Sequence, residues 1–124
     1  MNRQELFAYH NIVCKEALDI MIKKNNDYAG ADGETPFANF ERTEAMGICS
    51  TEQSFLVRIT DKLSRLSTFV STGELRVTNE SYKDAIHDLI NYLILFGAYV
   101  ESKESTLHHQ KQEQEPTCLQ TTHT

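Results

Sequence analysis

The chain has 124 residues, which is enough for one domain, and its apolar share of 40% is enough for a single hydrophobic core. Its formal net charge is −6 and its basic residues form no long run. Extended contact with a nucleic-acid polymer is therefore not expected, because such contacts need a row of Lys and Arg side chains. A small anionic ligand is compatible with this charge, because a few local cations or a bound metal ion can attract it.

The cellular setting is indicated by the cysteines and by the apolar segments. The three cysteines lie far apart and form no CxxC pair, so neither a zinc site nor a disulfide framework is predicted. The first residues contain no signal-like apolar stretch, and the longest apolar region, 89–100, includes Asn91 and is too short to span a bilayer. We therefore expect a cytoplasmic protein without a membrane partner.

The first predicted element is a helix over residues 5–24, where apolar residues recur at spacings of three, four and seven. Asn25 and Asn26 should end it, because their side chains compete with the helical backbone. Residues 27–36 contain two glycines and Pro36, which predicts a loop.

Two further helices are predicted around a turn at Gly47. Residues 37–46 favour a short helix that Gly47 ends, and Ser50 with Gln53 matches a capping box at the start of the next one. That third helix should run over 51–70. Its expected buried stripe consists of Phe55, Ile59, Leu63, Leu66 and Val70.

The last helix is predicted to start after Thr78 or Asn79, either of which is a good N-cap, and to end near residue 103. Its second half is apolar on nearly every side, which a chain of this size can hardly enclose, so a homo-oligomer (dimer or tetramer) is expected. Residues 104–124 are polar and are predicted to form a disordered tail after an all-α domain over 1–103. The predicted fold is all-α: three long helices and one short helix in a bundle whose core is completed by homo-oligomerisation.

Acidic residues on the last helix form the most informative pattern. Glu80, Asp84 and Asp88 are spaced by four and therefore share one side of a helix. Asp88 is followed directly by apolar residues, and a carboxylate at such a position must be ion-paired, hydrogen-bonded or bound to a metal ion. A metal site and a structural ion pair are both open for Asp84 and Asp88, and Glu80 is also compatible with a solvated acid.

Mixed charges on the third helix are the second pattern. Arg58, Asp61, Lys62 and Arg65 span about two turns, which by itself is also typical of a solvated, ion-paired face. If this helix packs antiparallel to the last one, Asp61 can face the carboxylates of the last helix. Together these acids would form an oxygen cage for Mg²⁺, with Lys62 or Arg65 reaching the remaining phosphate oxygens.

The segments around the first loop form a third pattern. Tyr28 and Phe40 can stack on a base, and Asn39 can hydrogen-bond to a base edge or a phosphate. The alternative is a loop anchored by two aromatic residues, with Asn39 holding backbone groups.

These motifs, taken in chain order, resemble a phage and bacterial family, the nucleotide-modification-associated domain of type one. That family is similar to the all-α nucleoside triphosphate pyrophosphohydrolases, which include MazG and the dimeric dUTPases. The resemblance covers roughly residues 20–100. It rests on Lys24-xx-Asp27-Tyr28, Asn39-Phe40, Arg58-xx-Asp61-Lys62-xx-Arg65-Leu66 and Asn79-Glu80-Ser81-xx-Asp84-xxx-Asp88-Leu89-xx-Tyr92.

The resemblance implies a magnesium-dependent (deoxy)nucleoside triphosphate pyrophosphohydrolase that acts on a phage or bacterial nucleotide pool. The implied magnesium ligands are Asp61, Asp84 and Asp88, and the last two would act in catalysis together with Glu80, the only base that can be named. The implied substrate-binding residues are Lys24, Asp27, Tyr28, Asn39, Arg58, Lys62 and Arg65.

The chain departs from the family pattern at the third helix. Where the better-known members carry a Glu-Glu-x-x-Glu run, this sequence has Asp61-Lys62-xx-Arg65. Fewer acids imply a single metal ion or binding without turnover. The alternative functions are therefore a non-catalytic protein that sequesters a nucleotide, or a structural module in which these charges only fix helix register.

Overall fold

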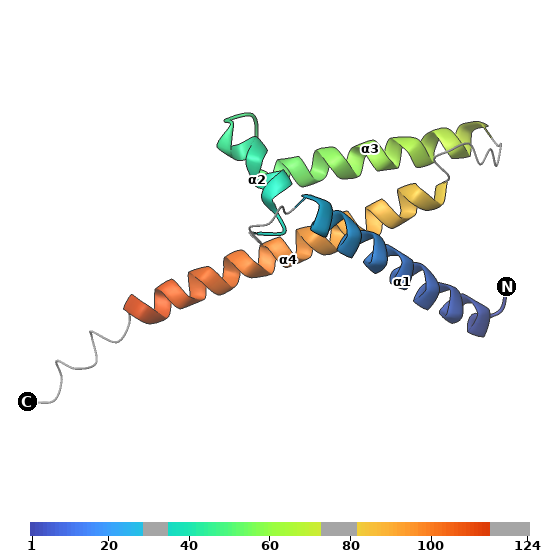
Figure 1. The fold of residues 1–124 in the computed structure, drawn as a ribbon, viewed down its shortest axis with the longest axis horizontal. Coiled ribbons are helices and arrows are strands. Elements are labelled where there is room, and N and C mark those ends of the chain that lie inside the picture. The colour runs from blue at the N-terminus through green and yellow to red at the C-terminus, as the bar shows by residue number, and fades with distance from the viewer. Residues whose placement is uncertain (29–34, 73–81, 115–124) are drawn as a thin grey trace, which may run out of the picture.

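The computed structural model describes residues 1–28, 35–72 and 82–114, and for 26–28 and 107–114 it describes the backbone alone. These residues form helices and no strands, which confirms the all-α prediction of three long helices and one short helix (Figure 1). In chain order the elements are α1 (Arg3–Tyr28), α2 (Ala38–Ala45), α3 (Thr51–Thr72) and α4 (Tyr82–Gln114).

Local signals explain where the first helix begins but not where it ends. The Asn2 side chain accepts a hydrogen bond from the Glu5 backbone N–H at 2.8 Å and so caps the start of α1. The helix continues through Asn25 and Asn26 to Tyr28, so its predicted end at residue 24 is wrong. The cost of Asn in a helix is only about 0.7 kcal/mol per residue, which tertiary contacts easily outweigh.

The turn between α2 and α3 is formed as predicted. Gly47 has a φ of +75°, the left-handed conformation that glycine adopts without steric cost. At the start of α3, the Gln53 N–H donates to Ser50 Oγ at 3.1 Å and the Ser50 N–H donates to Gln53 Oε1 at 3.0 Å. These two reciprocal bonds are the predicted capping box.

The last helix is longer than its sequence pattern indicated. The predicted N-caps Thr78 and Asn79 lie outside the described residues, but α4 continues to Gln114, so its predicted end near residue 103 is wrong. Residues 104–114 include Leu, Gln, Lys and Glu, which are good helix formers, and Pro116 follows shortly after the last helical residue. Residues 115–124 lie outside the described part of the chain. None of the described helices is both long and apolar enough to cross a membrane.

Helices α3 and α4 run antiparallel, as predicted (Figure 1). Near the start of α3, Glu52 pairs with Lys103 Nζ at 3.1 Å, and near its end Phe69 stacks on Tyr82 with ring centroids 5.0 Å apart. Helix α2 closes one end of this pair. The core beneath it is a cluster of buried aromatic side chains, namely Phe37, Phe40, Phe55 and Tyr99.

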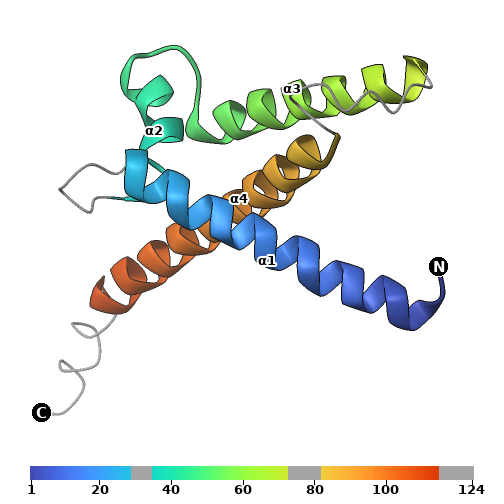
Figure 2. The same cartoon turned by 45° about the vertical axis from the view of Figure 1, so that its right-hand side comes forward.

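Helix α1 crosses α4 and is joined to it by polar contacts (Figure 2). The buried Asn91 amide donates to the Ala17 carbonyl at 2.9 Å, and His87 Nε2 lies 2.8 Å from Glu16 Oε2. Among the α1 residues whose side chains the structure describes, only Ala17 is buried. The position of α1 therefore depends on a few directed bonds rather than on a broad apolar contact.

Candidate functional site

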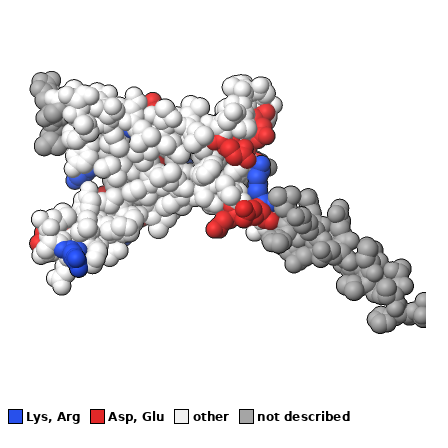
Figure 3. Space-filling view, turned by 180° about the vertical axis from the view of Figure 1, so that it is seen from behind, with Lys and Arg blue, Asp and Glu red and all other residues white. Residues whose placement is uncertain are grey.

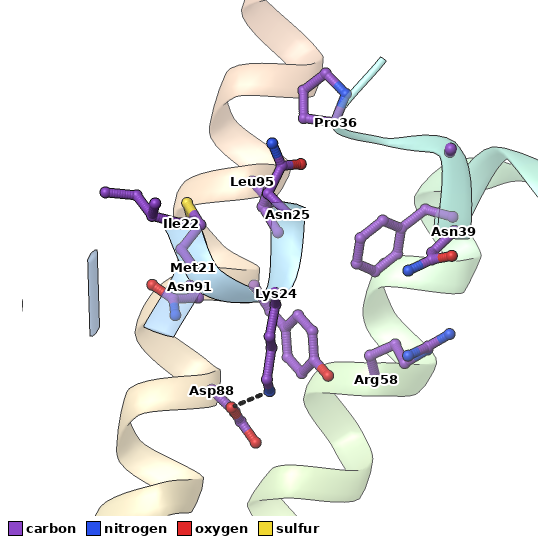
Figure 4. A pocket seen from close by; sticks show the side chains of 13 residues that line it. Met21, Ile22, Lys24, Asn25, Pro36, Asn39, Arg58, Asp88, Asn91 and Leu95 are labelled. Carbon is purple, nitrogen blue, oxygen red and sulfur yellow. Dashed lines mark hydrogen bonds and ion pairs between the residues drawn. The ribbon is translucent and has the colours of Figure 1, made fainter. Parts of the chain in front are cut away.

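A cavity of about 560 Å³ lies where the end of α1 and the start of α2 meet the middle of α3 and α4 (Figure 4). Its volume falls within the range of about 300–1,000 Å³ that is typical of small-molecule sites. The lining residues come from all four helices and the segment before α2: Met21, Ile22, Lys24, Asn25, Pro36, Ala38, Asn39, Phe40, Arg58, Asp88, Asn91, Tyr92 and Leu95.

Four of the predicted site residues line this cavity, and each comes from a different helix. They are Lys24 of α1, Asn39 of α2, Arg58 of α3 and Asp88 of α4. Their separation in the chain shows that the fold, rather than a local motif, gathers them. Figure 4 shows the Lys24 side chain extending to Asp88, and Arg58 on α3 lying apart from this pair.

Asp88 is held by two lysines at once. Its Oδ1 lies 3.2 Å from Lys24 Nζ, and its Oδ2 lies 3.0 Å from Lys62 Nζ. The side chains of Asp88 and Lys62 are only 15% and 14% exposed, whereas that of Lys24 is 53% exposed. The expectation that a carboxylate at position 88 must have a partner is therefore confirmed, and its described partners are cations.

The two ammonium groups decide the protonation state of Asp88. Burial raises its pKa, but the hydrogen bond from Lys62 and the positive charge of Lys24 lower it by more. The net pKa of Asp88 is therefore below its ordinary value, and the side chain is a carboxylate at neutral pH.

Arg58 adds a third cation to the site. Its guanidinium carbon lies 5.6 Å from the centroid of the Phe40 ring, and within the described residues it forms no ion pair. Phe40 is buried and stacks on Phe55 with ring centroids 3.9 Å apart, so it anchors α2 in the core. The alternative interpretation of Phe40 as an aromatic anchor is thus the one that its packing supports.

The carboxylates predicted to hold magnesium do not come together. Helix α3 places Lys62, not Asp61, against Asp88, while Asp61 is 61% exposed and pairs with Arg65 at 3.7 Å. The predicted contact of Asp61 with α4 is therefore wrong, because neighbouring residues on a helix point about 100° apart. Asp84 is exposed and does not line the cavity. Among the described residues, no three His, Cys, Asp or Glu side chains are grouped to hold a metal ion.

Several predicted residues cannot be assigned to the cavity. Glu80 lies outside the described residues, as do the side chains of Asp27 and Tyr28. Arg65 is described, but it lies on α3 beside Asp61 and does not line the cavity. The described site thus has one carboxylate, Asp88, paired with Lys24 and Lys62, and Arg58 lines the same cavity.

Sequence reasoning missed the residues that attach α1 to the site. No sequence pattern singled out His87, yet it is buried against Glu16. In the sequence, Asn91 stood out only as a polar residue within an apolar run. That interruption was the usable signal, because a polar side chain inside such a run must find a buried partner.

Comparison of the chain with family models, with curated proteins and with solved structures gave no match. The function is therefore argued from the site alone.

Proposed function

We propose that this protein binds a nucleotide in the cavity between its four helices and contacts the phosphates directly through lysine and arginine. The observation that carries the proposal is the local charge. Lys24 and Lys62 contact the single carboxylate of Asp88, and Lys24 and Arg58 line the cavity, in a chain whose net charge is −6. A cationic cavity in an acidic protein attracts small anions while the rest of the surface repels nucleic-acid polymers.

The rest of the cavity supports a ligand with an apolar, hydrogen-bonding group beside its phosphates. Met21, Ile22 and Leu95 provide apolar surface, and the side-chain amides of Asn25 and Asn39 also line the cavity. Asn and Gln amides can both donate and accept, which suits the edge of a nucleobase. Pockets that combine an apolar wall with a few polar groups are typical of small-molecule sites.

A magnesium-dependent pyrophosphohydrolase is the second candidate function. It is favoured by the position of Asp88 in the cavity wall, with Asp84 one turn earlier on the same helix. Magnesium in nucleotide enzymes is commonly held by one or two carboxylates together with substrate phosphates, so a full protein cage is not required. In this case the metal would enter with the nucleotide, and Lys24 would have to leave Asp88.

Thermal melting with a panel of nucleoside mono-, di- and triphosphates tests the proposal. Each nucleotide is added with EDTA or with Mg²⁺, and the products are separated afterwards by chromatography. A ligand that binds the native state at a concentration of 100 times its Kd stabilises it by about 2.7 kcal/mol. Stabilisation in EDTA supports direct phosphate binding, and release of a monophosphate and pyrophosphate with Mg²⁺ supports hydrolysis. If no nucleotide changes the melting temperature in either buffer, the proposal is wrong.

The protein also acts as a homo-oligomer in this proposal. Helix α4 extends beyond the other helices toward its C-terminal end (Figure 1). Apolar side chains on each long helix are more than half exposed, including Phe7, Ile12, Leu56, Val57, Leu93 and Ile94. Figure 3 shows one face of the molecule over which charged side chains are sparse.

A further inference from the structure

The two lysines that contact Asp88 are not equivalent. Lys62 is as buried as Asp88 and does not line the cavity, so it holds the carboxylate from behind the cavity wall. Lys24 lines the cavity, and its side chain is about half exposed at the end of α1. Lys24 can therefore change partner without leaving the site, whereas Lys62 cannot.

Because Asp88 has two lysine partners, the departure of Lys24 costs little free energy. Removing the only partner of a buried carboxylate is strongly destabilising, because an uncompensated charge stays behind. Asp88 would keep Lys62 at 3.0 Å if Lys24 moved away, so no buried charge would be left alone. The contact that breaks is the one at 3.2 Å to the half-exposed lysine, and ion pairs with exposed partners contribute little to stability.

We propose that Asp88 is a built-in competitor of the ligand: its carboxylate holds Lys24 in the empty protein, and a polyphosphate binds by taking Lys24 over. This inference rests on the proposed function, because it assigns roles within the same cavity. The incoming phosphate binds between Lys24 and Arg58, which both line the cavity. Asp88 and Lys62 remain paired behind it. In this arrangement Asp88 weakens anion binding, which is the opposite of what a magnesium ligand would do.

The test is calorimetric titration of inorganic tripolyphosphate in EDTA at low ionic strength. Lys24→Met should weaken binding about tenfold, as expected for loss of a charge-assisted hydrogen bond. Asp88→Asn should tighten binding roughly threefold, because Lys24 is no longer held in an ion pair. The matched control is Lys23→Met, which removes an exposed lysine next in the chain that does not line the cavity, and it should bind like the wild type.

We call the transfer of Lys24 from Asp88 to the phosphate the exchange. A double-mutant cycle distinguishes the exchange from simple electrostatic repulsion between Asp88 and the phosphate. The effect of Asp88→Asn should be smaller in the Lys24→Met background than in the wild type, because only the through-space repulsion then remains. If Asp88→Asn proves too unstable because it leaves Lys62 unpaired, Asp88→Asn combined with Lys62→Met removes both members of the buried pair. This double variant should bind more tightly than Lys62→Met alone.

The outcomes distinguish this inference from the function on which it rests. If the wild type binds tripolyphosphate and Asp88→Asn binds it more weakly, the exchange is wrong and the proposed function stands. Equal effects of Asp88→Asn in both backgrounds would also overturn the exchange. If no variant binds tripolyphosphate, the exchange is wrong, and the nucleotide panel decides separately whether the proposed function survives.

Discussion

Asp88 is a largely buried carboxylate that pairs with two lysines in the described structure. Its pKa is below the ordinary value because Lys62 and Lys24 outweigh the effect of burial. A carboxyl group whose pKa is lower in the folded state stabilises that state only while it is ionised. This contribution is fully present above the unfolded pKa of about 3.9 and is lost as the pH falls through the lower folded pKa.

We therefore predict that the melting temperature of the wild type falls below about pH 4 partly because Asp88 becomes protonated. Asp88→Asn should melt at a lower temperature than the wild type at pH 7 and should show a smaller further decrease on acidification. Asp19→Asn is the control, since Asp19 is an exposed carboxylate on α1. Melting curves between pH 3 and pH 7, within the range set by these carboxyl groups, provide the measurement. Parallel curves for the wild type and Asp88→Asn would contradict the assignment.

For single residues of the site, membership could be predicted from the sequence, but the contacts that they make could not. Arg58, Lys62 and Asp88 could be assigned to one site from their spacing and charge. Whether Asp61 or Lys62 meets Asp88 could not be predicted, because that choice depends on the rotation of α3 about its own axis. The rotation is set by tertiary packing, with the Phe55 ring 5.6 Å from Phe96 and fully buried.

At the scale of the elements, the two glycines in the described part of the chain differ in backbone conformation. Gly47 has a φ of +75° in the turn between α2 and α3, and Gly97 lies within α4. A Cβ atom added at either position would meet no atom within 4 Å, so the backbone conformation alone decides the effect of a substitution.

We predict that Gly47→Ala destabilises the protein by about 1–2 kcal/mol, because alanine is strained at positive φ. Gly97→Ala should instead stabilise it by up to about 1 kcal/mol, because alanine is the better helix former. Chemical denaturation of the two variants, each serving as the other's control, measures both free energies of unfolding. If Gly97→Ala is destabilising, another chain must pack closely against this face of α4.

Boundaries set by local chemistry were predictable, and those set by tertiary contacts or weak propensity were not. The turn at Gly47 and the capping box of Ser50 and Gln53 depend on a few adjacent residues, and both were predicted correctly. The predicted end of α1 at residue 24 was one turn short, and at that position Lys24 is bonded to Asp88 of α4, a tertiary contact that no local signal reveals. The end of α4 was missed because polar composition alone does not distinguish a solvated helix from a coil.

At the scale of the whole molecule, several apolar residues of α3 remain exposed because no other part of the described chain covers them. Leu63 and Val70 were predicted to lie in a buried stripe, yet they are 52% and 75% exposed, and Leu56 is 57% exposed. These three residues are spaced by seven, so they share one side of the helix. A row of this kind is covered in helical proteins by another helix, and a second copy of this chain offers the same row.

We predict that the protein is a homo-oligomer in solution and that Leu56→Lys combined with Leu63→Lys shifts it to the monomer. Two lysines in the row place like charges where apolar contact is needed, and each buried Leu lost contributes about 1.5–3 kcal/mol. Sedimentation velocity over a range of concentrations gives the mass of the wild type and of the variant. Ser64→Lys is the matched control, because it adds a lysine at an exposed position of α3 away from the row. A wild type that stays monomeric at every concentration, or a double variant with unchanged mass, would show that this row is not the contact between copies.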